Sequence, residues 1–451
     1  MNAMLRAAWV FGALMSTVPP AAALTQQQLD ACVKMSAGIS LDQKIDGCTA
    51  AIESGGWSGA KLAWAFNNRA IAYQLKGDLD RAFADLDQAI RLDPTDAPAY
   101  ANRGMIYQAR DDLDHAVADY DEAIRLNPAH SLAFNNRATA YKDKKEYDRA
   151  ITDLNEAIRL APQFVQAFHN RAGAYEAKGD IERAIADLGE VVRLAPSSPD
   201  AYYDRGTVLQ AKGDLDRAIA DFDRAIQLKP DYEIAFINRG NAYLAKGEPD
   251  RAIADYNGAI RLNPEYVLAF NNRGNAYRGK GDAARAIADF DTAIQLDPKE
   301  FVTYYNRGLA RLFSGALPEA RADFEKARAL EPNNAFAALW LDIVDRRSNR
   351  ASRLAQALPQ IDMMTWPAPV IRLYLGEITP EAVLAAADDP HAETKARHIC
   401  EADLLMGELA LLRGPNDEAV RLFRLALMHC RKNTNPWADA GTELKALGAS
   451  P

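Results

Sequence analysis

The stretch AWAFNNRAIAYQLKGDLDRAFADLDQAIRLDPTD, residues 63–96, contains the pattern that decides the fold. Its first half carries apolar and small residues at helical spacing, Gly77 then interrupts the chain, and a second helical pattern runs on to Pro94. Glycine between two such runs and proline after the second are typical of two helices joined by a tight turn. We therefore expect this segment to be an antiparallel two-helix hairpin.

The same pattern recurs with a period of 34 residues. If Ala63 is position 1, every unit has an aromatic residue at position 4, Ala or Gly at position 8 and Ala at position 20. Small residues at positions 8 and 20 lie about equally far from the turn, which lets the two helices approach closely. The proline that ends each unit is Pro94, Pro128, Pro162, Pro196, Pro230, Pro264, Pro298 or Pro332. Residues 63–334 are therefore predicted to form eight consecutive hairpins of an all-α repeat array.

These units resemble the tetratricopeptide repeat (TPR) pattern W-x2-L-G-x2-Y…A-x3-F…A…P. The resemblance implies a TPR α-solenoid, a right-handed superhelix whose first helices line a concave groove. One position departs from the pattern, because position 7, normally Leu, is Arg in every unit. The matching residues are Phe66, Arg69, Ala70, Tyr73, Ala82, Leu86, Ala89 and Pro94 in the first unit, and Phe270, Arg273, Gly274, Tyr277, Ala286, Phe290, Ala293 and Pro298 in the seventh.

The arginine at position 7 has a counterpart, since position 23 is Asp in every unit. This aspartate lies among positions 20, 24 and 27, which are buried in the expected second helix, so its carboxylate needs a partner. Both positions are eight residues from the turn, which places them opposite one another across the hairpin. We predict a repeated structural ion pair, such as Arg69 with Asp85 and Arg205 with Asp221, rather than a ligand site.

A row of amides at position 6 of the first helices is the candidate binding site. An Asn amide offers a donor and an acceptor, so such a row can pair with the backbone of an extended peptide. The row resembles the asparagine ladder in the TPR array of the O-linked N-acetylglucosamine transferases, which implies peptide binding. The alternative is that these amides only brace adjacent helices. The candidate groove residues are Asn68, Asn102, Asn136, Asn170, Asp204, Asn238, Asn272 and Asn306, flanked at position 5 by Asn67, Asn135, His169, Tyr203, Asn271 and Tyr305.

Four cysteines lie outside the repeats, in a predicted N-terminal helical cap (24–62) and a degenerate TPR-like hairpin with a C-terminal helix (400–451). Cys32 and Cys48 are each eight residues from Ser40, at the expected turn of the cap. Cys400 and Cys430 are each fifteen residues from Pro415, in another expected turn. Since cysteines equidistant from a hairpin turn can face one another, we predict the disulfides Cys32–Cys48 and Cys400–Cys430. Reduced, buried thiols are the alternative.

An irregular helical segment is expected over 335–399, where the 34-residue period is lost. The order WPAPVIRLYLGEITPE, CEADLLMGELALLRG, AVRLFRLA and ELKALG from residue 366 onward resembles the C-terminal region of bacterial envelope adaptors of the new-lipoprotein-I type. That resemblance implies a scaffold that holds peptidoglycan hydrolases and a processing protease. Two features depart from it: no cysteine for lipidation follows the predicted leader, and the array is longer.

The first 23 residues have the pattern of a secretory signal peptide. Arg6 precedes the apolar run 7–18, and the segment ends in the Ala-x-Ala cleavage pattern of Ala21 to Ala23. We expect cleavage and export to the bacterial periplasm or medium, with retention as an anchor as the alternative. No later run of eighteen apolar residues occurs, so no integral membrane segment is expected in the mature chain.

The 451 residues include 53 Lys and Arg against 62 Asp and Glu, a net charge of −9. The absence of a basic excess argues against nucleic acid as a partner. The motifs G-x-S-x-G, H-E-x-x-H, C-x-x-C and the P-loop are absent, and the six histidines do not cluster. We therefore expect no catalytic residues, no cofactor and no metal.

The sequence as a whole favours an exported protein-interaction adaptor that binds extended segments of envelope proteins in the TPR groove. Cell-wall hydrolases or proteases are the partners implied by the C-terminal resemblance. The alternative is a subunit of a structural or assembly complex that packs through its convex face or its ends. An enzyme is the least favoured class, and only residues 335–399 could hold its active site.

Overall fold

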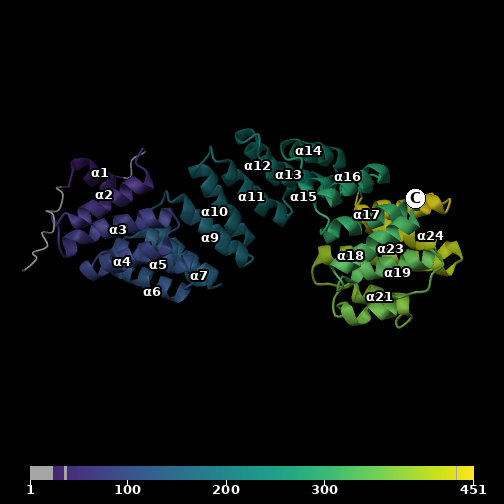
Figure 1. The fold of residues 1–451 in the computed structure, drawn as a ribbon. Coiled ribbons are helices and arrows are strands. Elements are labelled where there is room, and N and C mark those ends of the chain that lie inside the picture. Colours follow the sequence, from purple (N-terminus) through teal and green to yellow (C-terminus); the bar gives the residue numbers. More distant parts are fainter. Residues whose placement is uncertain (1–23, 35–37, 433, 451) are drawn as a thin grey trace, which may run out of the picture. The chain divides into compact units, whose positions relative to one another are not determined.

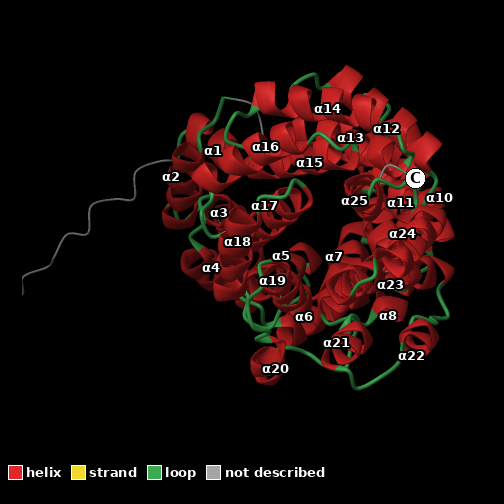
Figure 2. Ribbon diagram, turned by 90° about the vertical axis from the view of Figure 1, so that its right-hand side faces the viewer, coloured by secondary structure: helices red, strands yellow, loops and turns green. Residues whose placement is uncertain are grey.

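The computed structural model describes residues 24–34, 38–432 and 434–450. Within these ranges the chain forms 25 α-helices and one short 3-10 helix, joined by short loops, and no strand (Figure 2). The all-α fold class is confirmed. The chain divides into two compact units, residues 1–194 and 195–451, and each is described by itself (Figure 1). The predicted leader, residues 1–23, lies outside the described residues.

The first unit consists of successive helix pairs, with each pair packed against the next. Helices α1 and α2 form the segment before the repeats, and the other four pairs coincide with the first four 34-residue units. The helices are α1 (Gln26–Val33), α2 (Leu41–Glu53), α3 (Ala60–Leu75), α4 (Leu79–Leu92), α5 (Ala97–Ala109), α6 (Leu113–Leu126), α7 (Ser131–Asp143), α8 (Tyr147–Leu160), α9 (Val165–Ala177) and α10 (Ile181–Leu194).

The second unit begins with four more pairs, α11 (Pro199–Lys212), α12 (Leu215–Leu228), α13 (Glu233–Ala245), α14 (Pro249–Leu262), α15 (Val267–Gly279), α16 (Ala283–Leu296), α17 (Phe301–Phe313) and α18 (Leu317–Leu330). The remaining helices are less regular. They are α19 (Ala335–Arg347), α20 (Leu354–Ala357), the 3-10 helix Leu358–Gln360, α21 (Ala368–Leu375), α22 (Pro380–Ala386), α23 (Ala392–Arg413), α24 (Asn416–His429) and α25 (Asn435–Ala446).

Each hairpin closes where a small residue at position 8 meets the side chain at position 24. A Cβ atom added to Gly104 would lie 2.7 Å from the Tyr120 ring, and one added to Gly407 in α23 would lie 2.6 Å from the Phe423 ring. The repeats keep this volume constant, because Gly at position 8 always accompanies an aromatic residue at position 24, whereas Ala accompanies Leu. Position 24, more than Ala at position 20, therefore sets how closely the two helices approach.

The turns between the paired helices contain one residue in the left-handed region. Glycine supplies it in most units, as Gly77 does with φ 80°. Asp111 and Lys145 adopt the same conformation in the second and third hairpins of the repeat array, with φ 62° and 61°. The next residue often caps the second helix, as Asp78 does by accepting a hydrogen bond from the Arg81 backbone N–H. Local turn chemistry thus explains the constant spacing of the hairpins.

The arginine at position 7 and the aspartate at position 23 form an ion pair in all eight repeat hairpins. Arg69 Nε and Nη2 donate to the two carboxylate oxygens of Asp85 at 2.7 and 2.8 Å. Most of these arginines also reach back to position 25 of the preceding hairpin, as Arg103 Nη1 does to Asp87 Oδ1 at 3.1 Å. Asp85 raises the pKa of the Arg69 guanidinium through this hydrogen bond. The arginine therefore joins the two helices of one hairpin and links that hairpin to its neighbour.

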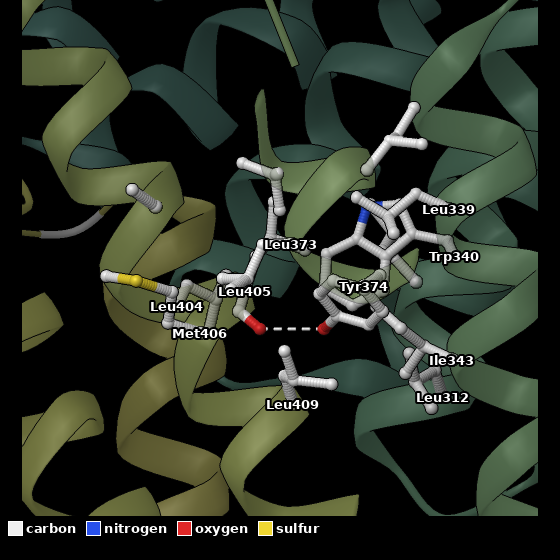
Figure 3. Close-up of a cluster of buried hydrophobic side chains, with 14 of the residues drawn as sticks. Leu312, Leu339, Trp340, Ile343, Leu373, Tyr374, Leu404, Leu405, Met406 and Leu409 are labelled. Atoms are coloured by element: carbon white, nitrogen blue, oxygen red, sulfur yellow. Dashed lines mark hydrogen bonds between the residues drawn. The ribbon is translucent and has the colours of Figure 1, made fainter. Parts of the chain in front are cut away.

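The irregular helices of the second unit surround a core of large apolar side chains (Figure 3). Trp340 and Ile343 on α19 pack with Leu373 and Tyr374 on α21 and with residues of α23. The Tyr374 hydroxyl is buried and donates to the Leu405 carbonyl oxygen at 2.7 Å. Both predicted disulfides are present, Cys32–Cys48 between α1 and α2 and Cys400–Cys430 between α23 and the end of α24.

Candidate functional site

The surface that could bind a peptide is made by the first helix of each hairpin, and we call it the first-helix face. In the first unit it consists of α3, α5, α7 and α9, each in contact with the next. In the second unit it consists of α11, α13, α15 and α17, which also contact one another in order. All candidate groove residues lie on these eight helices.

The amides at position 6 mostly donate to the preceding first helix. Asn102 Nδ2 donates to Asn67 Oδ1 at 2.8 Å, and Asn238 Nδ2 donates to the Tyr203 hydroxyl at 2.9 Å. Asn68 donates in the same manner to the Cys32 carbonyl oxygen at 3.3 Å. Bracing of adjacent helices, the alternative to peptide binding, is therefore a role of these residues. In each of these bonds the Asn side chain uses one N–H of its amide as the donor. The bond does not involve the carbonyl oxygen of that same amide.

A chain of four amides on α7 and α9 begins at Gln166, whose Nε2 donates to Asn170 Oδ1 at 3.0 Å, and ends at Asn136. Asn170 Nδ2 donates to Asn135 Oδ1 at 2.9 Å, and Asn135 Nδ2 donates to Asn136 Oδ1 at 3.2 Å. Asn136 is half-buried, and its own Nδ2 group is not used in this chain. Hydrogen bonds in series polarise one another, which makes the terminal N–H groups better donors.

Four positions on the first-helix face of the first unit carry no charge, whereas position 12 of the same helices includes Lys142 and Glu176. Positions 2, 5, 6 and 9 of α3, α5, α7 and α9 contain no Asp, Glu, Lys or Arg, although a quarter of the chain is charged. Apolar side chains are exposed on these helices, since Leu75 on α3 is 62% exposed and Leu132 on α7 is 46% exposed. Leu132 also borders a shallow hollow of about 560 Å³ between the start of α7 and Phe164. This surface suits a neutral backbone and apolar side chains.

The corresponding face of the second unit is covered at α15 and α17 by the chain's own α25, seen in yellow beside α17 (Figure 1). Asp439 on α25 forms an ion pair of 3.1 Å with Arg278 on α15, and both side chains are buried. Asn435 donates to Asn275 on the same helix at 3.3 Å. Candidate residues in this region are consequently part of the packing. Asn271 is buried and donates to Thr303 Oγ1 at 2.7 Å.

The remaining candidate residues have mixed surroundings. Tyr305 packs on Phe324 and on the C-terminal core, and Asn306 is buried. Neither residue lines an open groove, although the sequence suggested both as groove residues. Asn272 is half-buried and donates to Asn241 Oδ1 at 3.0 Å. Asp204 on α11 is half-buried, and His169 on α9 of the first unit is exposed.

Sequence reasoning missed the position of α25, although it predicted the helix. Position 12 of the first helices gave no distinct signal, because Lys142 in the third hairpin is a cation like Arg278 in the seventh. In the structure Arg278 meets a carboxylate of α25, that of Asp439. Nothing in the 34-residue period connects these residues, which are 161 apart in the case of Arg278 and Asp439.

The described residues contain no group of three His, Cys, Asp or Glu side chains placed to hold a metal ion. No described helix is long and apolar enough to cross a membrane. In the segment 335–399 the buried acids have arginine partners: Asp342 pairs with Arg346 at 2.7 Å, and Asp345 with Arg321 at 2.7 Å. These acids are therefore accounted for by packing between helices.

Successive antiparallel helix pairs, each packed on the next, define the chain as an α-helical repeat protein. Sequence profiles described as tetratricopeptide repeat match residues 63–96, 97–130, 131–164, 169–233 and 237–301, slightly more than half of the chain. The chain belongs to the TPR proteins. TPR repeats bind other proteins, so the chain is a protein-interaction scaffold. The TPR family is a non-catalytic fold.

Several solved TPR proteins are similar to parts of the chain. YrrB, described as a TPR protein with an unusual peptide-binding site, is 25% identical with a TM-score of 0.36, over 41% of this chain and 95% of that one. MamA is 29% identical with a TM-score of 0.34, over 36% and 95%. A TPR protein from Parabacteroides merdae is 22% identical with a TM-score of 0.41, over 55% and 98%.

Proposed function

We propose that the protein is an exported adaptor that binds extended peptide segments of partner proteins on the first-helix face of α3, α5, α7 and α9. The observation that carries this proposal is the absence of charge from positions 2, 5, 6 and 9 of those helices. A bound strand has a neutral backbone, and buried charges opposite it would lack partners. An uncharged surface with amides and exposed leucines avoids that penalty.

The amides and leucines contribute differently to this site. Asn136 supplies N–H donors for peptide carbonyl groups, and the carbonyl oxygens of Asn68 and Asn102 supply acceptors for peptide N–H groups. Leu75 and Leu132 offer exposed apolar surface to side chains of the bound segment. Binding of this kind selects for unfolded, weakly charged stretches and tolerates many sequences.

Export and envelope partners are also part of the proposal. Two disulfides support an oxidising compartment, because such bonds are rare in the reducing cytosol. The leader pattern of residues 1–23 points to the same compartment. The C-terminal resemblance to new-lipoprotein-I type adaptors would make peptidoglycan hydrolases or proteases the partners.

The alternative is packing through the convex face, made by the second helix of each hairpin, or through the ends, and it has less support from the surface chemistry. That face carries exposed ion pairs within single helices, such as Arg125 with Glu122 at 2.5 Å and Arg193 with Glu190 at 2.8 Å. Such pairs are well solvated and offer little apolar surface to a permanent partner.

A photo-crosslinking amino acid in place of Ile71 on α3 identifies, in cells, the partner segments that contact the first-helix face of the first unit. A synthetic peptide of the crosslinked segment is then titrated into the purified chain and into Leu132→Asp. We expect binding to weaken at least tenfold, because the variant places an unpaired charge in the contact. Leu262→Asp on α14 is the matched control, since Leu262 is 41% exposed on a second helix. Equal affinities for all three proteins would refute binding on this face.

A further inference from the structure

Helix α25 sits on α15 and α17 in the place where a bound segment would lie on the first-helix face. Its contacts are made by polar side chains at the centre, Asp439 to Arg278 and Asn435 to Asn275. About one turn further along α25, Glu443 forms an ion pair of 3.0 Å with Arg347 Nη2, and Arg347 also contacts Glu408 on α23 at 2.5 Å. The helix is therefore held by ion pairs to α15 and α19 and by apolar packing, because Ala440 and Leu444 are buried in the C-terminal core and Trp437 packs against it.

These polar contacts are incompletely satisfied. Arg278 is 7% exposed, yet its Nε and Nη1 atoms have no hydrogen-bond partner. Asn271 Oδ1 on the same helix, Arg347 Nε and Glu408 Oε1 are also buried without partners. Buried N–H groups without acceptors are destabilising, and a guanidinium is best satisfied by a carboxylate that accepts two parallel bonds. Asp439 supplies only one such bond to Arg278.

We propose that the face of α15 and α17 is a second binding site, for an acidic helical segment of a partner protein, and that α25 occupies this site as an intramolecular ligand. The partner segment carries carboxylates four residues apart, as Asp439 and Glu443 are, because that spacing places both on one side of a helix. Small residues between them allow the close approach that Ala440 allows now. A segment that satisfies Arg278 bidentately displaces α25.

The proposal is independent of the peptide site on the first unit, since the two sites share no residue and take different ligands. An intramolecular helix acts at a high effective concentration, so it competes strongly with any free segment. The apparent affinity of the site for a partner is reduced by the fraction of molecules in which α25 is seated. Weakening α25 alone must therefore strengthen binding of the free helix.

The test is fluorescence anisotropy with a labelled peptide of residues 434–447 and the full-length chain. The double variant Asp439→Asn with Glu443→Gln weakens the resident helix and leaves the peptide unchanged. We expect the peptide to bind this variant at least tenfold more tightly than the unaltered chain. Adding Arg278→Ala should abolish that gain, and a peptide with Asn and Gln at the two acidic positions should show none of it. Glu418→Gln, which removes an exposed carboxylate on α24, is the matched control and should leave binding unchanged.

Equal binding to the double variant and the unaltered chain, or equal binding of the acidic and amide peptides, would overturn the proposal. Hydrogen exchange of α25 in the unaltered chain is a second measurement that needs no variant. Millimolar acidic peptide should increase exchange over residues 435–446, and the amide peptide should not. Unchanged exchange with the acidic peptide would show that α25 is a fixed part of the fold.

Discussion

The first-helix faces of the two units are built from the same hairpin but meet different surroundings. In the first unit positions 2, 5, 6 and 9 of α3, α5, α7 and α9 carry no charge, and Leu132 is exposed. In the second unit α15 presents the buried Arg278, and α25 covers it. The position 7 and position 23 ion pairs are the same in both. The repeat thus supplies a common scaffold, and a few side chains on one helix face decide what binds there.

The largest effect should come from the ion pairs that both regions share. Asp153→Ala in the first unit and Asp221→Ala in the second each leave a partly buried arginine without its carboxylate, and we expect a loss of about 3 kcal/mol in each case. Urea unfolding followed by circular dichroism measures it. The matched controls are Asp148→Ala and Asp216→Ala, whose side chains are 85% and 82% exposed. These exposed pairs should contribute less than about 1 kcal/mol.

A large loss in one unit and a negligible loss in the other would show that the common scaffold does not have a common energetic basis. Equal, small losses for all four variants would show that the arginines are solvated in both units.

The dependence of stability on pH should separate the two units. Burial raises the pKa of Glu408 to about 8, against the lowering effect of Arg347, while Glu443 and Asp439 raise it further. The folded chain then holds a proton that the unfolded chain releases above its ordinary pKa, so stability falls as pH rises from 5 to 8. The slope is at most about 1.4 kcal/mol per pH unit. Hydrogen exchange of α23 should show the loss, and Glu408→Gln should remove the part above pH 6, since burial also raises the pKa of Asp439 to about 6.

Exchange of α7 in the first unit is the internal reference for this measurement, because Asp153, the buried acid facing that helix, is paired with Arg137. The same pH dependence in α7 and α23, or an unchanged slope in Glu408→Gln, would contradict the assignment.

The smallest effect should come from two glycines of the first unit. A Cβ atom at Gly104 would lie 2.7 Å from the Tyr120 ring, whereas one at Gly173 on α9 would lie 3.9 Å from Lys142 Nζ. Gly104→Ala should therefore destabilise the chain by about 1–2 kcal/mol through overpacking. Gly173→Ala should stabilise it by about 0.5–1 kcal/mol through helix propensity. Thermal unfolding measures both, and a stabilising Gly104→Ala would refute the close packing at position 8.

The site could be predicted only in part. The row of amides was visible at position 6, but its hydrogen bonds to position 5 of the preceding hairpin, such as Asn102 to Asn67, depend on how hairpins stack. An Asn amide has four hydrogen-bonding positions, and its spacing in the sequence does not say which of them a neighbour uses. The stacking of one hairpin on the next makes bracing of adjacent helices one role of these amides.

The sequence by itself determined the hairpins, their turns, the Arg/Asp pairs and the disulfide partners. In all of these the interacting residues are equidistant from a turn, so helix geometry alone brings them together. The position of α25 depends on tertiary contacts, such as that of Arg278 with Asp439, which are 161 residues apart in the sequence. No periodicity relates such residues. Their meeting depends on the shape and charge of the whole interface, which exists only once the array has folded.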